Sequence, residues 1–441
     1  MNQPAIPHLH PKMRYVYVGV DSHKKTHTAV FLTCFYEHLG TLVVPNVPSE
    51  FTQFLKDAKQ FLQPHTEFAF AFEDTTAYGR NFVKFLHVNG YLVKHTNANL
   101  VASERNSKNT LNKSDTIDAE ACARVLLNRF DELPLALTDD KMFIFKNLVS
   151  RRKAMVKMST MLKNQLHALL PDHYPTYFDF FSSLEHRSAL GFYETYPSPS
   201  ALEQVSLEEL TTFFKDLTGK GEAWANQKAT RILKAVKSEG IQPFEYQELR
   251  DFTISSIVRQ IRNNLQEIEI IKAHLEDFLN LLDIPLTSMK GIDTAIACSL
   301  IAEIGNITRF KNAAALAKYA GISPATYASG QSHSEYANKR GNRELGATFH
   351  QLALALILER RESKHILNPI MHQYYHKKLS EGKTKKQALK AVKRRLVTIV
   401  YGIMKYKHDF INPPTSFVSK ETIEQREARL YKTAATFNKT D

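Results

Sequence analysis

Between residues 14 and 130, short apolar runs alternate with amphipathic stretches. Short runs rich in β-branched and aromatic residues are typical of strands, whereas apolar residues three or four positions apart are typical of helices. The pattern predicts strands at residues 15–20, 27–32, 41–44, 68–72 and 91–95. It predicts helices at residues 51–62 and 78–88, and a further helix that begins at Asp115. Three strands that can pair as a meander, followed by alternating helices and strands, predict a mixed α/β sheet with the RNase H-like order.

Beyond Pro134 the pattern becomes helical. Residues 148–170 form an amphipathic, strongly basic helix that is predicted to stop at Pro171, and residues 377–407 form a second basic helical stretch. Residues 252–282 carry apolar side chains at alternating spacings of three and four. This spacing predicts a coiled coil that serves as an extended arm or a dimer contact, while packing within a helical bundle is the alternative.

A glycine turn at Gly291 precedes a predicted helix at residues 297–304 and resembles a helix-hairpin-helix. That motif points backbone N–H groups at a DNA phosphate. Asp293 stands where a second glycine is usual, and its negative charge would weaken phosphate contact, so a structural role and a binding role are both open. The predicted domains are residues 14–135 (α/β), 136–245 (basic helical segment and spacer), 246–283 (coiled coil), 284–415 (helical C-terminal domain) and 416–441 (tail).

Composition narrows the class of protein. The chain has 441 residues, of which 58 are Lys or Arg and 45 are Asp or Glu, for a formal charge of +13 that favours nucleic acid as a partner. No apolar run approaches the roughly 20 residues that span a bilayer, so we expect no membrane partner. The first 12 residues lack the apolar core of a signal peptide, and the three cysteines form no CxxC pair, which predicts a cytoplasmic protein without disulfides.

Four acidic residues are the strongest candidates for chemistry. Asp21 and Glu73 each follow a predicted buried strand, and Asp115 and Asp118 share one face of the helix that they begin. Singly, each is better explained as a turn, a surface acid or a helix cap. Together, their convergence in an RNase H-like fold predicts a site that holds paired Mg²⁺ ions for phosphodiester chemistry.

Neighbouring residues compete for these roles. Asp74 is the alternative to Glu73, and Glu120 is the alternative to Asp118. His23 and His27 have the i,i+4 spacing of a zinc pair, but they flank a strand and a turn, which argues against zinc. A loop is predicted at residues 319–330, where a Ser-Gly step at Ser329 is by itself only a turn.

The chain resembles the DEDD transposases of bacterial insertion sequences, a family that includes the Piv DNA invertases. The resemblance rests on residues 18–21, 72–79, 113–119, 289–292, 309–310, 319–324, 329–330 and 339–342. It implies a RuvC-like N-terminal domain, a coiled coil for assembly and a C-terminal transposase domain. Asp21, Glu73, Asp115 and Asp118 would hold Mg²⁺, and Ser329 would attack a DNA phosphate to form a covalent phosphoserine link without ATP. The chain departs from the family at two positions. Asp293 replaces a small residue of the hairpin, and Gly346 stands where the family often has arginine.

The resemblance also implies partners. These are donor and target DNA, a noncoding bridge RNA that selects sequence by base pairing, and further copies of the chain in a dimer or tetramer. Such a protein would lie in the bacterial cytoplasm and associate with the nucleoid when bound to DNA. With the charge pattern, the resemblance predicts nucleic-acid contacts from Arg151, Arg152, Lys153, Lys339, Arg340, Asn342, Arg343, Lys386, Lys390 and Arg394; a solvated basic face is the alternative.

Three other functions remain open at this point. The chain could be a site-specific DNA invertase of the Piv type, or a RuvC-like junction nuclease in which water attacks the phosphate and no covalent intermediate forms. It could also be a nucleic-acid-binding protein without catalytic activity.

Overall fold

The computed structural model describes residues 10–73, 77–107, 112–136, 139–240, 244–329, 332–336, 338, 341–359 and 366–411. Two compact units, Met1–Phe143 and Ile144–Asp441, are described separately below. Within the described ranges, none of the helices combines the length and the apolar character that crossing a bilayer requires.

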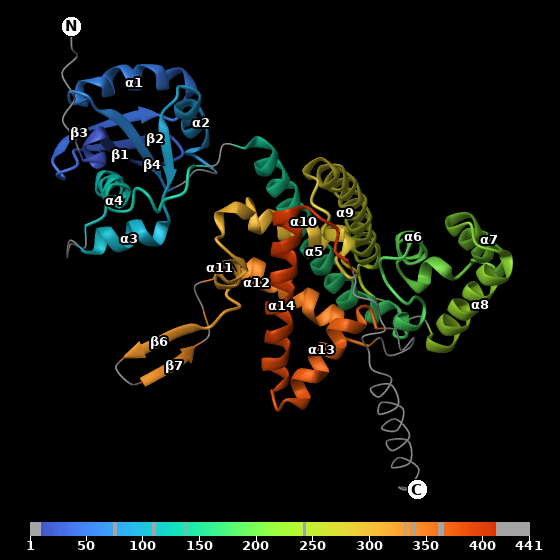
Figure 1. Cartoon of the computed structure of the whole chain (residues 1–441). Helices are drawn as coiled ribbons and strands as arrows, with labels where there is room; N and C mark the ends of the chain where they lie inside the picture. Colours follow the sequence, from blue (N-terminus) through green and yellow to red (C-terminus); the bar gives the residue numbers. More distant parts are fainter. Residues whose placement is uncertain are drawn as a thin grey trace. The chain divides into compact units, whose positions relative to one another are not determined.

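A five-stranded mixed sheet forms the centre of the first unit (Figure 1). Its strands are β1 (Tyr15–Ser22), β2 (Thr26–Leu32), β3 (His38–Pro45), β4 (Glu67–Phe72) and β5 (Leu92–His95). Their order is β3-β2-β1-β4-β5; β2 is antiparallel to β1 and β3, while β4 is parallel to β1 and β5. The predicted mixed sheet is confirmed, and its meander followed by parallel crossovers is compatible with an RNase H-like fold.

Helices cover both faces of this sheet (Figure 1). Alternation along β1 sends Val16, Val18 and Val20 into the core that holds α1 (Phe51–Ala58) and α2 (Arg80–Val88). The opposite face packs against helices α3 (Ala98–Ser107) and α4 (Asp115–Asn128). The predicted helices at α1, α2 and α4 are confirmed, whereas α3 was not predicted.

Gly19 lets α4 lie directly against β1. A Cβ atom at this position would sit 2.1 Å from the carbonyl oxygen of Ala119 and 2.2 Å from the amide nitrogen of Ala123. Both atoms belong to the helix backbone, so neither can rotate away. The absence of a side chain therefore sets how closely the helix that begins with Asp115 approaches the strand that carries Asp21.

Gly19→Ala is expected to push α4 away from β1 and to destabilise the first unit by about 3 kcal/mol, at the upper end for overpacking. Urea unfolding followed by circular dichroism measures this change. Gly402→Ala is the matched control, because a Cβ there meets nothing within 4 Å, and alanine favours the helix in which Gly402 lies. Equal stabilities of the Gly19 variant and the wild-type protein would contradict the packing argument.

In the described residues of the second unit, the regular elements are helices and one hairpin. After α5 (Asp140–His173), its helices are α6 (Arg187–Thr195), α7 (Leu207–Thr218), α8 (Glu222–Glu239), α9 (Gln247–Leu282), α10 (Thr294–Ile304), α11 (Ala313–Tyr319), α12 (Arg343–Ile357), α13 (Pro369–Ser380) and α14 (Lys385–Tyr406).

The predicted stop at Pro171 was wrong, because this proline lies inside the last turn of α5 and removes one backbone donor only. The predicted basic helix at residues 377–407 is two helices, separated at Gly382, whose φ is +84°.

The segment predicted as a coiled coil, residues 252–282, lies within helix α9. Its Ile254, Val258 and Ile261 belong to one buried cluster with Leu166 of α5 and Phe192 of α6. Farther along α9, the buried side-chain amide of Asn264 donates to the carbonyl oxygen of Met155 at 2.7 Å. These contacts give α9 a place in an intramolecular bundle, and a coiled-coil contact with another copy stays a prediction.

Residues predicted as a loop form part of a hairpin instead. Strands β6 (Ala325–Ser329) and β7 (Ser332–Tyr336) pair in antiparallel register, with Ser329 opposite Ser332. At the base of this hairpin two glycines cross, since a Cβ at Gly341 would lie 2.3 Å from the amide nitrogen of Gly321. Gly321 also has a φ of +69°, a left-handed conformation that favours glycine.

Asp293, the residue that departs from the helix-hairpin-helix pattern, has a local structural role. Its carboxylate caps α10 by accepting a hydrogen bond of 2.7 Å from the amide of Ile296. The preceding Gly291 has a φ of +105°, as a tight turn requires. Phosphate binding by this motif remains a prediction.

Candidate functional site

The sheet brings Asp21 and Glu73 to the same edge. Strands β1 and β4 are parallel neighbours whose register pairs Val20 with Phe72, and each carboxylate residue follows directly after this pair. Because parallel strands end at one edge of a sheet, the two side chains meet there although 52 positions separate them in the sequence (21 to 73).

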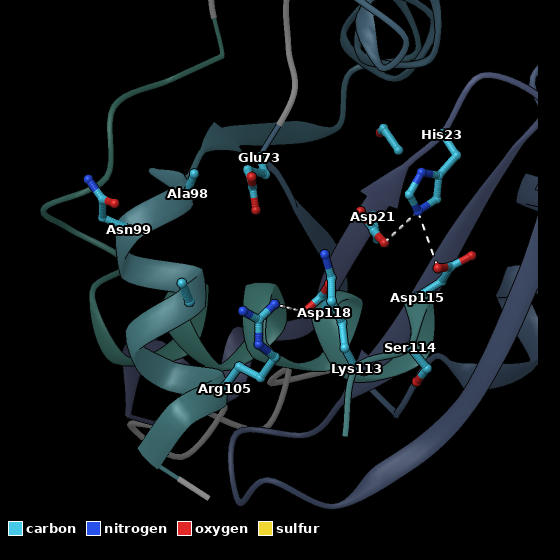
Figure 2. Close-up of a pocket in the computed structure, with 12 residues that line it drawn as sticks. Asp21, His23, Glu73, Ala98, Asn99, Arg105, Lys113, Ser114, Asp115 and Asp118 are labelled. Carbon is cyan, nitrogen blue, oxygen red and sulfur yellow. Dashed lines mark hydrogen bonds and ion pairs between the residues drawn. The ribbon is translucent and has the colours of Figure 1, made fainter. Parts of the chain in front are cut away.

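The first turn of α4 supplies the other two acids. Ser114 caps this helix by accepting a hydrogen bond from the amide of Ile117, so neither Asp115 nor Asp118 is the cap. Figure 2 shows all four carboxylates around one cavity of about 640 Å³. The residues that line this cavity are Asp21, Ser22, His23, Glu73, Ala98, Asn99, Ala102, Arg105, Lys113, Ser114, Asp115 and Asp118.

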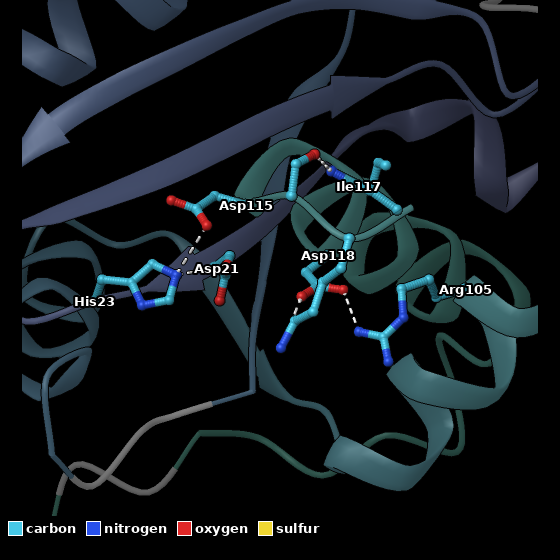
Figure 3. Close-up of polar contacts among 8 residues, drawn as sticks. Asp21, His23, Arg105, Asp115, Ile117 and Asp118 are labelled. Atoms are coloured by element: carbon cyan, nitrogen blue, oxygen red, sulfur yellow. Dashed lines mark hydrogen bonds and ion pairs between the residues drawn. The ribbon is translucent and has the colours of Figure 1, made fainter. Parts of the chain in front are cut away.

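Figure 3 shows His23 between two of these acids. Its Nε2 atom lies 3.0 Å from Oδ2 of Asp21 and 3.3 Å from Oδ1 of Asp115. The His23 side chain is 51% exposed, whereas that of Asp21 is 18% exposed. One end of the cavity therefore holds two carboxylates that converge on a single ring nitrogen.

Asp118 lies beside two cations at the other end of the cavity (Figure 2). Nη1 of Arg105, from α3, is 2.5 Å from Oδ1 of Asp118, and Nζ of Lys113 is 3.9 Å from Oδ2. The Asp118 side chain is only 13% exposed. Asp118 is therefore more buried than Asp21 and Asp115, and it already has positively charged side chains beside it.

Burial and crowding raise the pKa of two of the acids. For Asp21 burial is the main cause, and nearby Asp118 and Asp115 raise the pKa further, while His23 lowers it. For Glu73 burial again dominates, and the charges of Asp21 and Asp118 add to it. The cavity therefore disfavours its own negative charge, and a cation among the carboxylates would offset that cost.

The structure also distinguishes Asp118 from its competitor Glu120. Glu120 forms an ion pair with Arg124 at 2.9 Å and is not among the residues that line the cavity. Asp74, the alternative to Glu73, lies outside the described residues.

The predicted serine and basic residues lie in the second unit. Ser329 is the last residue of β6. Lys153 forms ion pairs with Glu303 at 3.6 Å and Glu344 at 3.3 Å, and the side-chain amide of Asn342 donates to Glu303 at 2.9 Å. Lys153 and Asn342 therefore have internal partners.

Other basic candidates are more accessible. The residues Arg151, Arg343, Lys386 and Arg394 are exposed, Arg152 and Lys390 are partly buried, and Lys339 and Arg340 lie outside the described residues. Nucleic-acid contact remains a prediction for the whole set.

The charged or titratable residues of the cavity that were not among the predicted site residues are His23, Arg105 and Lys113. His23 was considered only together with His27, as a possible zinc pair, and His27 is fully buried in the core beside Phe82. The signal that identifies His23 is its position two residues after Asp21, which places both side chains on one side of an extended segment. Arg105 lies on α3, the helix that was not predicted, and carried no comparable signal.

Two transposase family models match the chain. One, described as transposase, matches residues 18–175, and the other, described as transposase of the IS116/IS110/IS902 family, matches residues 284–376. The first includes all four acids, and the second includes Ser329.

Individual relatives agree with these matches. The chain is 26% identical to the IS110 insertion-element protein of Streptomyces coelicolor over 298 residues, covering 66% of this chain and 71% of the relative. It is 23% identical to the IS116 insertion-element protein of Streptomyces clavuligerus over 407 residues, covering 90% and 97%. It is 28% identical to the pilin gene-inverting protein of Moraxella bovis over 127 residues, covering 28% and 37%. The chain belongs to the IS110/IS116/IS902 family of transposases.

Proposed function

We propose that this transposase cuts and rejoins DNA with a Mg²⁺-dependent carboxylate site and a serine nucleophile. Asp21, Glu73, Asp115 and Asp118 are the proposed metal ligands, and Ser329 is the proposed nucleophile. The observation that carries the proposal is the convergence of four acids from three distant segments in one cavity of a family member. A set of helix caps and surface acids would have no reason to meet in this way.

The donor set fits the proposed metal. Carboxylate oxygens are the ligands that Mg²⁺ prefers, and Mg²⁺ commonly combines one or two of them with water and phosphate oxygens. When bound, the metal would stabilise charge on the phosphate and lower the pKa of a coordinated hydroxyl group. The raised pKa values of Asp21 and Glu73 support the proposal, because a cation would relieve the repulsion that contributes to them.

The proposed reaction balances without an external energy source. The Ser329 oxygen forms a bond to the scissile phosphorus while the bond from phosphorus to the leaving DNA oxygen breaks. The serine hydroxyl loses its proton to solvent, and the leaving oxygen takes one up. Attack by a different DNA hydroxyl on the phosphoserine link then rejoins the strands and releases the serine.

The proposed partners are donor and target DNA, further copies of the chain and a noncoding bridge RNA. A net charge of +13 suits polyanionic partners. In a dimer or tetramer, the acids and the serine of one reaction centre would come from the same copy or from different copies.

Inversion of a DNA segment is the alternative outcome of the same chemistry. The similarity to the pilin gene-inverting protein of Moraxella bovis supports inversion as an alternative outcome. Sequencing the DNA junctions formed in cells that carry the gene with its flanking DNA separates the two outcomes, because excision leaves a circular junction and inversion leaves two reoriented ones.

Covalent protein–DNA adducts test the proposed mechanism. The full chain, purified with its RNA, is incubated with DNA containing the flanks of its gene, with Mg²⁺ or with a chelator, and is then resolved on denaturing gels. We expect an adduct that requires Mg²⁺ and disappears after protease treatment. Cleaved DNA without an adduct would instead indicate a junction nuclease that uses water, and an absence of metal-dependent cleavage would indicate a binding protein.

Arg105→Gln is expected to raise the affinity of the metal-free protein for Mg²⁺ roughly tenfold, because Arg105 competes with a cation for Asp118 through a charged hydrogen bond. Isothermal titration calorimetry measures this affinity. Arg129→Gln is a suitable control, since its ion pair with Glu132 lies at the surface. A weaker affinity in the Arg105 variant would show that Arg105 supports the acid site rather than competing with the metal.

A further inference from the structure

His23 is held in place by backbone contacts. The amide of His23 donates to the carbonyl oxygen of Thr26 at 3.0 Å, closing the turn between β1 and β2. The side-chain amide of Asn46 donates to the His23 carbonyl oxygen at 3.4 Å and to that of Tyr78 at 3.2 Å. The ring is therefore presented to the cavity by an anchored turn.

The carboxylates of Asp21 and Asp115 both approach the Nε2 atom of His23. The ligand atoms of Asp21, His23 and Asp115 all lie within 4.8 Å of one another, which is the spacing of groups that share an ion. A half-exposed histidine gains little stability from an ion pair, so stability alone does not explain why two carboxylates from different elements meet at its Nε2 atom.

We propose that His23 is a ligand of the metal held by Asp21 and Asp115, and that its ring nitrogen makes this position bind Mn²⁺ in preference to Mg²⁺. The inference rests on the proposed metal site and deepens it. Mg²⁺ demands oxygen ligands, whereas first-row divalent metals also accept imidazole nitrogen, so one nitrogen donor shifts the preference between them.

The two ends of the cavity then differ in chemistry. Asp21 and Asp115 share the ring nitrogen of His23, while Asp118 faces the positive charges of Arg105 and Lys113. A cation binds more readily at the first end because fixed positive charges oppose it at the second. We infer that the His23 end is filled first in the DNA-free protein.

Pulsed electron paramagnetic resonance of Mn²⁺ bound to the full chain tests the nitrogen ligand directly. The wild-type spectrum should contain modulation from a directly bound imidazole nitrogen, and His23→Gln should lose it. Titration should show a fall in Mn²⁺ affinity of about 10- to 100-fold in His23→Gln, on the scale of changes around metal ligands, with a smaller fall for Mg²⁺. His87→Ala, a change of an exposed histidine on α2, should alter neither measurement.

Two further variants separate the possible outcomes. His23→Asp, which supplies an oxygen ligand, should retain Mg²⁺ binding but lose the preference for Mn²⁺. If Asp21→Asn abolishes Mn²⁺ binding while wild-type spectra contain no nitrogen signal, the proposed metal site stands and His23 is not a ligand. If Mn²⁺ binds equally well to the wild-type protein and to Asp21→Asn, the metal site itself is overturned.

Discussion

Asp21→Asn is expected to abolish DNA strand exchange and, without metal, to raise the thermal stability of the first unit. The amide removes a negatively charged metal ligand, and losing several kcal/mol of charge stabilisation slows the reaction roughly a thousandfold or more. The same substitution removes a charge that burial, Asp118 and Asp115 make unfavourable. Activity and stability should therefore change in opposite directions.

The stability effect has a defined pH dependence. Because the folded-state pKa of Asp21 is raised above its ordinary value of 3.8, ionisation costs the folded protein more than the unfolded chain. Below the ordinary pKa both states are protonated and the variant has no advantage. The advantage grows as pH rises through the raised pKa and is complete above it.

Thermal unfolding in a chelator at several pH values measures this dependence, and a rise of roughly 2–4 °C corresponds to about 1 kcal/mol for a unit of this size. Glu67→Gln is the matched control on the neighbouring strand, since Glu67 makes an exposed ion pair with Arg14. Its activity and melting temperature should stay near wild-type values. An active Asp21→Asn protein would remove Asp21 from the mechanism.

Ser329→Ala is expected to eliminate the covalent adduct and recombination while leaving DNA affinity nearly unchanged. The hydroxyl oxygen is the atom proposed to bond to phosphorus, so no other group of the variant replaces it. Binding persists because contacts from Lys and Arg to phosphates dominate affinity for DNA. Adduct gels and filter binding at matched salt measure the two quantities.

Ser332→Ala provides a control in the same hairpin, because Ser332 pairs with Ser329 in the strand register. It should retain adduct formation. Recombination that persists in Ser329→Ala would exclude this serine, and an adduct lost equally in both variants would point to a general requirement for the hairpin.

The first unit was largely predictable because its strands are apolar and short. Strands β1, β2 and β4 are mostly buried, as their apolar runs indicated, and the positions of Asp21 and Glu73 followed from where two of these runs ended. Helix α3 escaped prediction because its sequence is mostly polar and buries only Val101. Arg105, which this helix carries into the cavity, was missed for the same reason.

The second unit was less predictable in detail. The segments Ala325–Ser329 and Ser332–Tyr336 lack apolar alternation, so a hairpin pattern was not visible in them. The periodicity of α9 was read correctly as a helix, but periodicity does not distinguish packing within one chain from packing between chains. The partners of Lys153 and Asn342 depend on Glu303, which lies far from both in the sequence, and local patterns contain no information about such contacts.

The close approach of Gly321 and Gly341 ties together the two segments that lead into and out of the hairpin. A Cβ atom at Gly341 would lie 2.3 Å from the amide nitrogen and 2.4 Å from the Cα atom of Gly321. Main-chain atoms cannot rotate away from such a clash, so any larger residue at position 341 would force the two segments apart. Because Ser329 lies in the strand between these segments, a substitution twelve positions farther along the chain would change how the helices hold that strand.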